Sequence, residues 1–272
     1  MPTIDLTGRP IVITGASSGI GAATAVACAR AGMPVVLGAR RMDKLESVVE
    51  RIRGGGGRAA AVAMDVTDPG QCAAMIERCV AEFGSVYGVY ANAGYGDEVA
   101  VADMSDATLR AMFETNYFGS LNVIRPALER MKKNPGPHRG HVLWCSSCLG
   151  KFSIPMYGVY CATKAAQAHT SRAMNVELRS QGIFSTSVHP IGTRTEFFDQ
   201  MRTRAPGGSI SEHTPQWFMQ SPDFVARQTL AALRRPRAEV WTGLTGALVR
   251  TGMALGTMFP GVAEVALRRM VR

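Results

Sequence analysis

The residues with the clearest chemical potential are a tyrosine and a lysine four positions apart, Tyr160 and Lys164. On a helix, this spacing places both side chains on one face. A phenol with a pKa of about 10 is a poor base near neutral pH, but a neighbouring ammonium group lowers that pKa. Ser147 lies 13 residues before Tyr160, where its hydroxyl can hydrogen-bond a substrate carbonyl. The three residues together predict acid–base chemistry, whereas Tyr160 and Lys164 alone would also fit a helix-surface pair.

A glycine-rich turn, TGASSGIG at 14–21, follows the first apolar run of the chain. Gly15, Gly19 and Gly21 let the backbone turn tightly and approach a pyrophosphate, and the N–H groups of the next helix supply an anion site. An ordinary strand-to-helix turn is the alternative interpretation. The position of this turn in the first β-α-β unit favours a dinucleotide site.

Two arginines, Arg40 and Arg41, end the second predicted strand, where an acidic residue would bind the ribose 2′-hydroxyl of NAD. Guanidinium groups pair with phosphate in a forked geometry, so this strand end favours NADP(H) over NAD(H). A solvated arginine pair is the alternative. Asp65 and Val66 follow the third predicted strand, where they can reach the adenine edge.

The elements that position these residues are short apolar runs that alternate with helical patterns, which is typical of a parallel sheet covered on both faces. The predicted strands are 10–14, 34–39, 59–63, 86–91, 140–146, 183–189 and 238–242. The predicted helices are 19–31, 43–53, 69–83, 105–133, 157–181 and 222–234. We therefore predict an α/β fold, a Rossmann-like doubly wound sheet of seven parallel strands with right-handed crossovers.

The predicted domain organisation is simple, because no linker interrupts the alternation of strands and helices. Residues 1–242 are expected to form one NAD(P)-binding catalytic domain. Within it, the segment 192–221 is a long connection at the ligand edge of the sheet, which makes it a candidate lid over the substrate. Residues 243–272 follow the last strand as a C-terminal extension of the same domain.

The composition narrows the class of protein. The 272 residues include 30 Lys and Arg against 21 Asp and Glu, a formal net charge of +9, and 46% are hydrophobic. These values exclude a disordered polyelectrolyte, a collagen-like repeat and a disulfide-dense miniprotein. Residues 225–272 carry 8 basic and 2 acidic side chains, so most of the surplus lies at the C-terminal end. We expect no nucleic-acid partner, because no recognition motif accompanies the basic residues.

The sequence also bears on location and redox state. It begins without a signal-peptide pattern, and no run of 18 apolar residues follows, so we expect a cytoplasmic protein. The six cysteines show no framework spacing and are expected to be reduced thiols. Cys145 and Cys148 form a C-x-x-C around Ser147, but no second pair has metal-ligand spacing, so we expect no metal site.

The motifs taken together resemble the short-chain dehydrogenase/reductase family, in its single-domain branch with the glycine spacing TGxxxGxG. The motifs that carry the resemblance are TGASSGIG, Asn92-Ala93-Gly94 after the fourth strand, Asn116 in ETNYFG, Ser146-Ser147, and Tyr160 with Lys164. They occur in the family's order from about residue 8 to 242. Three positions depart from the family pattern. Ala91 stands in place of the first asparagine of the usual NNAG, and Ile191 follows Pro190 in place of glycine. Ser18 stands where many NADP-preferring members carry a basic residue.

The resemblance implies a role for each matching residue. Tyr160 would be the general acid/base, Lys164 would lower its pKa and hydrogen-bond the nicotinamide ribose, and Ser147 would hold and polarise the substrate oxygen. Asn116 would hold a water that links Lys164 to solvent. The implied cofactor-binding residues are Gly15, Ser17, Ser18, Gly19, Ile20, Gly21, Arg40, Arg41, Asp65, Val66, Asn92, Ala93, Gly94, Tyr160, Lys164, Pro190, Thr193 and Thr195.

The function predicted on this basis is NADP(H)-dependent interconversion of a ketone or aldehyde and an alcohol, with NAD(H) as the less favoured cofactor. Apolar residues in and near the candidate lid indicate a hydrophobic substrate; they are Leu149, Phe152, Ile154, Met156, Phe197, Phe198, Trp217 and Phe218. The alternative function is a dinucleotide-binding regulator or scaffold that has lost catalysis. Because all four implied catalytic positions are present, we favour the enzyme.

Two expectations concern partners. The resemblance implies a homodimer or homotetramer, assembled through the helices at 105–133 and 157–181. The C-terminal extension combines arginines with apolar residues, so it could contact anionic lipid as a peripheral membrane element. We favour instead that residues 244–267 pack over the substrate cleft or against a partner subunit.

Overall fold

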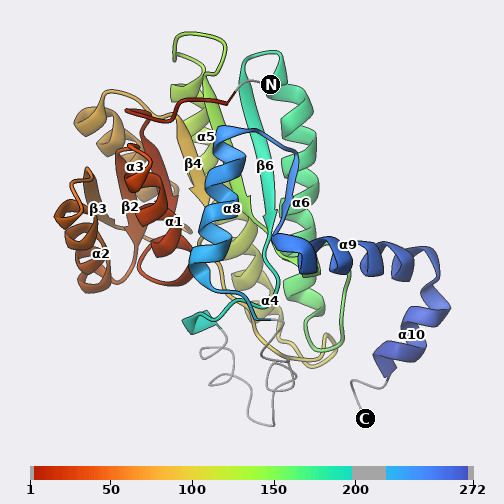
Figure 1. Cartoon of the computed structure of the whole chain (residues 1–272). Helices are drawn as coiled ribbons and strands as arrows, with labels where there is room; N and C mark the ends of the chain where they lie inside the picture. Colours follow the sequence, from red (N-terminus) through yellow and green to blue (C-terminus); the bar gives the residue numbers. More distant parts are fainter. Residues whose placement is uncertain (1–2, 198–218, 269–272) are drawn as a thin grey trace.

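The computed structural model of the protein describes residues 3–197 and 219–268, and its core is one parallel β-sheet (Figure 1). Seven strands pair in parallel, in the order β3-β2-β1-β4-β5-β6-β7, which confirms the predicted doubly wound topology. The strands are β1 (Ile11–Thr14), β2 (Val35–Ala39), β3 (Ala59–Ala63), β4 (Gly88–Ala91), β5 (Gly140–Cys145), β6 (Ile183–His189) and β7 (Glu239–Trp241).

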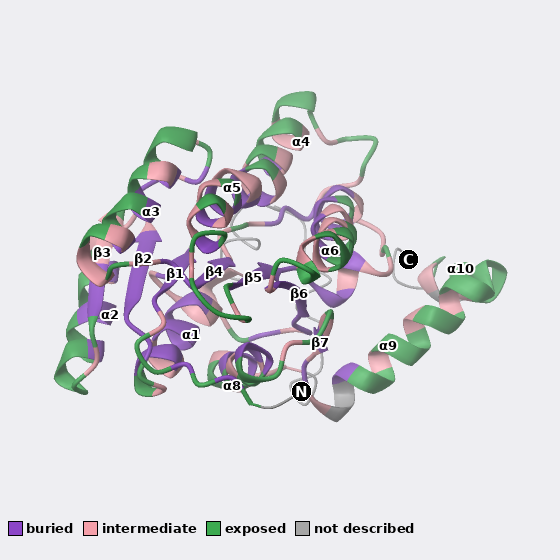
Figure 2. Ribbon diagram, turned by 90° about the horizontal axis from the view of Figure 1, so that it is seen from above, coloured by how far each residue is buried: buried purple, intermediate pink, exposed green. Residues whose placement is uncertain are grey.

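Helices cover both faces of this sheet, as Figure 2 shows from above. On one face lie α1 (Gly19–Arg30), α2 (Met42–Gly54) and α8 (Pro222–Arg234). On the other lie α3 (Pro69–Phe83), α4 (Asp106–Phe113), α5 (Gly119–Met131) and α6 (Gly158–Arg179). One π-helical turn, η1 (Glu114–Phe118), joins α4 to α5, and a short 3₁₀ turn, η2 (Cys148–Gly150), follows β5.

The strands are apolar on both sides, because each side faces a helical layer. In β1, Ile11 and Ile13 belong to the core beneath α1 and α8, while Val12 belongs to the core beneath α3 and α5; all three are fully buried. Local signals set the helix ends. Asp68 caps α3 by accepting from two backbone N–H groups, and Gly84 ends it in the left-handed conformation at φ 82°.

The order of the strands reverses between β1 and β4, and this reversal locates the ligand crevice. The chain winds outward from β1 to β3, returns to β4 on the other side of β1, and continues to β7. In doubly wound sheets, ligands bind outside the carboxyl ends of the strands at such a switch point. The predicted site residues follow β1, β2, β3, β4, β5 and β6, so the fold brings them to this single edge.

The C-terminal extension forms two helices, α9 (Gly243–Met258) and α10 (Pro260–Arg268), which project from the β7 side of the domain (Figure 1). α9 contacts β7 and η2, and α10 contacts α9. Several of their apolar side chains are exposed, including Leu248 at 67% and Val262 at 74%. In the described part of the chain, no helix is long and apolar enough to cross a membrane.

Candidate active site

A cavity of about 870 Å³ opens at the switch point, and most of the predicted site residues line it. This volume suits a cofactor together with a small substrate. The predicted residues that line it are Gly15, Ser17, Ser18, Gly19, Ile20, Arg40, Arg41, Asp65, Val66, Asn92, Ala93, Gly94, Ser147, Tyr160, Lys164, Pro190, Thr193 and Thr195. Gly21 and Asn116 do not line the cavity, and neither do three of the apolar residues expected near the substrate, Phe152, Ile154 and Met156. Of the candidate lid, residues 198–218, and with them Phe198, Trp217 and Phe218, lie outside the described residues.

The glycine turn has no room for side chains. A Cβ atom at Gly15, whose φ is +63°, would lie 2.8 Å from the Ala93 Cα. A Cβ at Gly21 would meet the Gly15 carbonyl oxygen and would lie 2.6 Å from the Asn92 Nδ2. Asn92 holds the turn in place, because its Nδ2 donates to the backbone oxygens of Thr14 and Gly15 at 3.0 and 3.1 Å.

The N-terminus of α1, directly after this turn, suits an anionic group. Its first turn contains no acidic residue, and the Ser18 side chain makes no capping hydrogen bond with the helix. The free N–H groups and the helix dipole therefore favour a phosphate. Together with the glycines that permit close approach, this end of the cavity fits the pyrophosphate of a dinucleotide.

The two arginines at the end of β2 differ in their contacts. Arg40 is largely exposed, and its Nη1 lies 3.9 Å from Asp65 Oδ2. Arg41 Nη2 donates to the hydroxyls of Ser17 and Ser18, each at 3.0 Å, so its guanidinium lies beside the glycine turn. Its Nη1 pairs with Glu196 at 2.7 Å, an ion pair between residues 155 positions apart that the sequence did not indicate.

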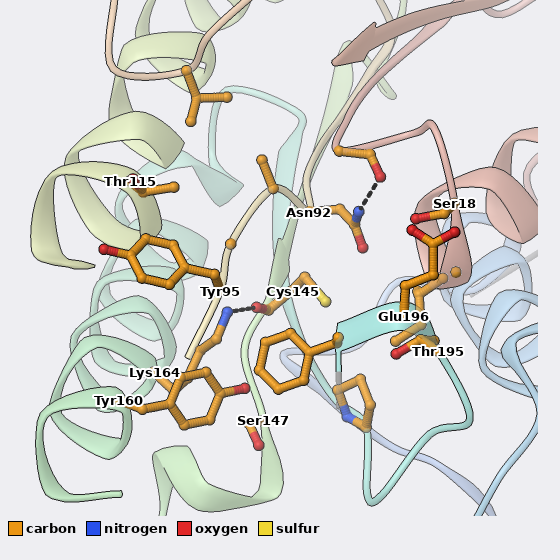
Figure 3. Close-up of a pocket in the computed structure, with 18 of the residues that line it drawn as sticks. Ser18, Asn92, Tyr95, Thr115, Cys145, Ser147, Tyr160, Lys164, Thr195 and Glu196 are labelled. Carbon is orange, nitrogen blue, oxygen red and sulfur yellow. Dashed lines mark hydrogen bonds between the residues drawn. The ribbon is translucent and has the colours of Figure 1, made fainter. Parts of the chain in front are cut away.

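Tyr160, Lys164 and Ser147 lie close together at the other end of the cavity (Figure 3). Tyr160 and Lys164 lie on α6, and the Lys164 Nζ is 5.6 Å from the centre of the Tyr160 ring. The Lys164 ammonium donates to the backbone oxygen of Cys145 at 2.7 Å. The Ser147 hydroxyl accepts from the Leu149 N–H at 3.2 Å, which orients it at the N-terminus of η2.

Burial determines the acid–base properties of this group. It raises the pKa of Tyr160, while the Ser147 hydroxyl acts in the opposite direction and lowers it. Burial also lowers the pKa of Lys164. The sequence led us to expect that Lys164 lowers the pKa of Tyr160. In the protein without cofactor, the net effect is instead a raised pKa, because burial destabilises the phenolate more than the neighbouring groups stabilise it.

Asn116 lies in the π-helical turn η1, and its side chain bonds entirely within the protein. Its Oδ1 accepts from the Tyr95 N–H at 2.9 Å, and its Nδ2 donates to the Tyr95 carbonyl and the Thr163 hydroxyl at 2.8 and 3.1 Å. These bonds join the segment after β4 to α6. Such π-helical turns within helices occur frequently at functional sites.

Gln167 connects Lys164 to Asn116, a link that the sequence analysis missed. The Lys164 ammonium donates to the Gln167 Oε1 at 3.1 Å, and the Gln167 Nε2 donates to the Asn116 backbone oxygen at 2.6 Å and to the Ser120 hydroxyl at 2.9 Å. Gln167 is fully buried. The available signal was its spacing, since residues three and four apart share a helix face and Gln167 follows Lys164 by three.

A polar cluster behind Ser147 holds the serine in position. His189, at the end of β6, donates from its Nδ1 to the Ser147 backbone oxygen at 2.8 Å, and its ring stacks on the Trp241 ring with the ring centres 4.8 Å apart. Trp241 donates to Glu239, whose side chain is 10% exposed and pairs with Lys151 and Arg172. Burial alone raises the pKa of Glu239. Its three hydrogen bonds outweigh burial, and the net pKa is about 2.

The fold and this cavity define a doubly wound, Rossmann-like α/β protein with a cavity at the switch point, where such folds bind dinucleotides. A family model described as short chain dehydrogenase matches residues 9–206. The chain therefore belongs to the short-chain dehydrogenase/reductase family, as its motifs indicated. Membership in this family supports a dehydrogenase or reductase activity with a nicotinamide dinucleotide.

Individual proteins support this assignment. The chain is 30% identical to a short-chain type dehydrogenase/reductase from Mycobacterium marinum, whose crystal structure superimposes with a TM-score of 0.76 over 86% of this chain and 93% of that one. It is 33% identical over 87% of its length to the glycine betaine reductase ATRR of Emericella nidulans, of which it spans 18%. A short chain dehydrogenase/reductase from Burkholderia phymatum, whose crystal structure is in complex with NAD, is 22% identical to this chain. The two structures superimpose with a TM-score of 0.81 over 96% of each chain, which confirms the fold.

Proposed function

We propose that the protein is an NADP(H)-dependent oxidoreductase that interconverts a ketone or aldehyde with an alcohol. The observation that carries this proposal is the meeting of Tyr160, Lys164 and Ser147 at one end of a cavity whose other end fits a dinucleotide. The phenol, the ammonium group and the hydroxyl supply a proton, a positive charge and a second hydrogen bond at one point, which are what carbonyl reduction requires from the protein.

In the proposed reduction, the hydroxyl groups of Tyr160 and Ser147 donate hydrogen bonds to the substrate carbonyl oxygen and hold it. A bound nicotinamide cofactor would supply the hydride for the carbonyl carbon. The Tyr160 proton moves to the substrate oxygen, and Lys164 stabilises the resulting phenolate. Oxidation of an alcohol reverses these steps, with Tyr160 as the base. Asn116 positions α6 through its bond to Thr163.

The proposed preference for NADP(H) rests on Arg41. Its guanidinium lies beside the hydroxyls of Ser17 and Ser18 on the glycine turn, where a forked donor can bind a phosphate on the adenosine ribose. In the proposed complex, the α1 N-terminus and the glycine turn bind the pyrophosphate. Asp65 and Val66 lie at the adenine end, and Thr193 and Thr195 near the nicotinamide. Fluorescence titration with NADPH and NADH tests the preference, and tenfold tighter binding of NADH would overturn it.

The proposed substrate is hydrophobic, because apolar and aromatic side chains surround the space beside Tyr160. Leu149, Tyr95, Tyr157 and Phe197 line this part of the cavity, and the Phe197 and Tyr160 ring centres are 5.7 Å apart. Such side chains bind apolar surface and also exclude water from the site of proton transfer.

A single substitution tests the catalytic proposal. Tyr160→Phe removes the transferable proton, so we expect turnover to fall by about a thousandfold or more with every carbonyl compound that the wild type reduces. Tyr87→Phe is the matched control, because Tyr87 does not line the cavity and its buried hydroxyl has no hydrogen-bond partner. NADPH oxidation over a panel of ketones and aldehydes is the measurement. Cofactor binding by the wild type without turnover on any compound would favour the catalytically silent regulator instead.

We also propose that the chain forms a homodimer or homotetramer through its α4–α5 and α6 helices. Two apolar side chains there are exposed, Phe118 at 44% and Val176 at 75%. Their burial between subunits would remove apolar surface from water. Light scattering of the wild type and of Val176→Glu tests this: a wild-type dimer or tetramer that the variant weakens is expected, and a wild-type monomer would refute it.

A further inference from the structure

Glu196 lies where the adenosine end of the cavity meets the segment after β6 (Figure 3). Its Oε2 is 2.7 Å from Arg41 Nη1, and its Oε1 is 2.6 Å from Lys44 Nζ. Arg41 immediately precedes α2 and Lys44 lies in its first turn, so the two cations extend from the same end of one helix. The carboxylate thus occupies a site made of two positive side chains.

The same two cations are the kind of donors that bind a phosphate group. Arg41 also bonds to the Ser17 and Ser18 hydroxyls, so one guanidinium connects the glycine turn to Glu196. A guanidinium with an adjacent ammonium group provides several donors for the oxygens of a phosphate monoester. The hydrogen bonds from Lys44 and Arg41 lower the pKa of Glu196 to about 2, so its carboxylate is ionised at neutral pH.

We propose that Glu196 is an internal competitor for the 2′-phosphate of the cofactor and thereby determines how strongly the protein discriminates NADP(H) from NAD(H). A 2′-phosphate reaches Arg41 and Lys44 only by displacing the Glu196 carboxylate from them. A nucleotide with a free 2′-hydroxyl leaves the two ion pairs intact. This inference rests on the proposed dinucleotide site, and it assigns to Glu196 a role in specificity rather than in the hydride-transfer step.

Binding of nucleotide fragments tests the competition without any turnover. The two probes are adenosine 2′,5′-bisphosphate and adenosine 5′-monophosphate, which differ only in the 2′-phosphate. We expect Glu196→Gln to bind the bisphosphate about tenfold more tightly than the wild type does, because it removes a competing charge. Binding of the monophosphate should change less than about twofold. Titration calorimetry at low and high salt measures both, and the gain should shrink as salt screens the charges.

Two further variants identify the cause. Glu50→Gln removes one negative charge from the exposed surface of α2, outside the cavity, and should leave both affinities unchanged. Lys44→Gln should weaken bisphosphate binding, and in the double variant it should diminish the gain from Glu196→Gln, because Glu196 acts partly through Lys44.

Three results would overturn the inference, and they differ from one another. Equal changes for both probes in Glu196→Gln would indicate a general effect on the site. An unchanged bisphosphate affinity, with monophosphate binding intact, would exclude the competition and leave the nucleotide site standing. A wild type that binds neither probe nor NADPH and NADH would refute the proposed dinucleotide site and this inference together.

Discussion

Gln167 offers a test of the catalytic centre in which two substitutions have opposite predicted effects. Its Oε1 accepts a hydrogen bond of 3.1 Å from the Lys164 ammonium, and its amide donates to the Asn116 backbone oxygen. Gln167→Met removes this acceptor and keeps a similar volume. Gln167→Glu keeps the acceptor and adds a negative charge. In either variant, the Asn116 oxygen still accepts from the Ser120 hydroxyl, at 2.7 Å.

The size of the effect follows from the burial of the lysine. Burial already lowers the pKa of Lys164, and a hydrogen bond to a charged group contributes about 1.5–3 kcal/mol. Loss of this bond in Gln167→Met should lower the lysine pKa by about one to two further units. In Gln167→Glu, the carboxylate at the same position favours the ammonium and should raise the pKa by a similar amount.

The assay is the pH dependence of kcat/KM for carbonyl reduction, with the compound of the panel that the wild type reduces fastest. If Lys164 must be protonated, activity falls at high pH as the ammonium group loses its proton. The midpoint of this fall should move to lower pH in Gln167→Met and to higher pH in Gln167→Glu. Affinity for NADPH should change little, because Gln167 does not line the cavity.

Two outcomes would refute this reasoning. If both variants move the midpoint in the same direction, the effect comes from altered packing of α6 rather than from the charge of Lys164. If neither variant moves the midpoint while NADPH still binds, Gln167 has no influence on the lysine during turnover. Thermal unfolding of each variant shows that the comparison concerns folded proteins.

Two other predictions concern stability and the glycine turn. Glu239→Gln should destabilise the protein by about 3 kcal/mol at pH 7, because a carboxyl pKa lowered by folding contributes stability above 4.5, its pKa in the unfolded chain. The difference in unfolding free energy from the wild type should shrink as pH falls toward 2. Urea unfolding at pH 7 and pH 3 measures this difference. Gly21→Ala should abolish NADPH binding and lower the free energy of unfolding by about 1–3 kcal/mol, because the added methyl group overpacks the turn. The control Gly54→Ala, whose added methyl group would have no neighbour within 4 Å, should leave NADPH binding unchanged and stability unchanged or slightly higher. Fluorescence titration with NADPH and urea unfolding measure the two quantities.

The sequence predicted the fold, and it predicted most of the residues that line the cavity, because the relevant signals were local; the roles of those residues stay predictions. Each strand was a short apolar run, and the structure confirms all seven within two residues at either end. Tyr160 and Lys164 came together because helical spacing alone puts them on one face. The predicted helix at 105–133 proved to be two helices joined by the π-helical turn at Asn116, a departure in hydrogen bonding that residue spacing does not indicate.

What the sequence could not predict depends on contacts between distant segments. Glu196 pairs with Arg41 across 155 positions, and Gln167 reaches Asn116 across 51. A glutamate after a strand and a glutamine on a helix are common, and only the folded chain shows what they touch. The C-terminal extension was expected to pack over the cleft or against a partner subunit. Its described residues contact β7 and η2, and none of them lines the cavity, while packing against a partner stays a prediction.

In the proposed catalytic centre, each of three consecutive residues at the end of β5 is held by a hydrogen bond that has a backbone oxygen as its acceptor. At the end of β5, the Cys145 oxygen accepts from Lys164, the Ser146 hydroxyl donates to the Lys164 backbone oxygen, and the Ser147 oxygen binds His189. Three consecutive residues therefore join β5 to α6 and β6. Because the Tyr160 phenol contributes to none of these bonds, the loss of its hydroxyl should leave the centre intact. The two substitutions should therefore affect different properties. Tyr160→Phe should lose turnover and keep the stability of the wild type. Glu239→Gln, which alters the polar cluster behind Ser147, should reduce the free energy of unfolding more than it reduces turnover.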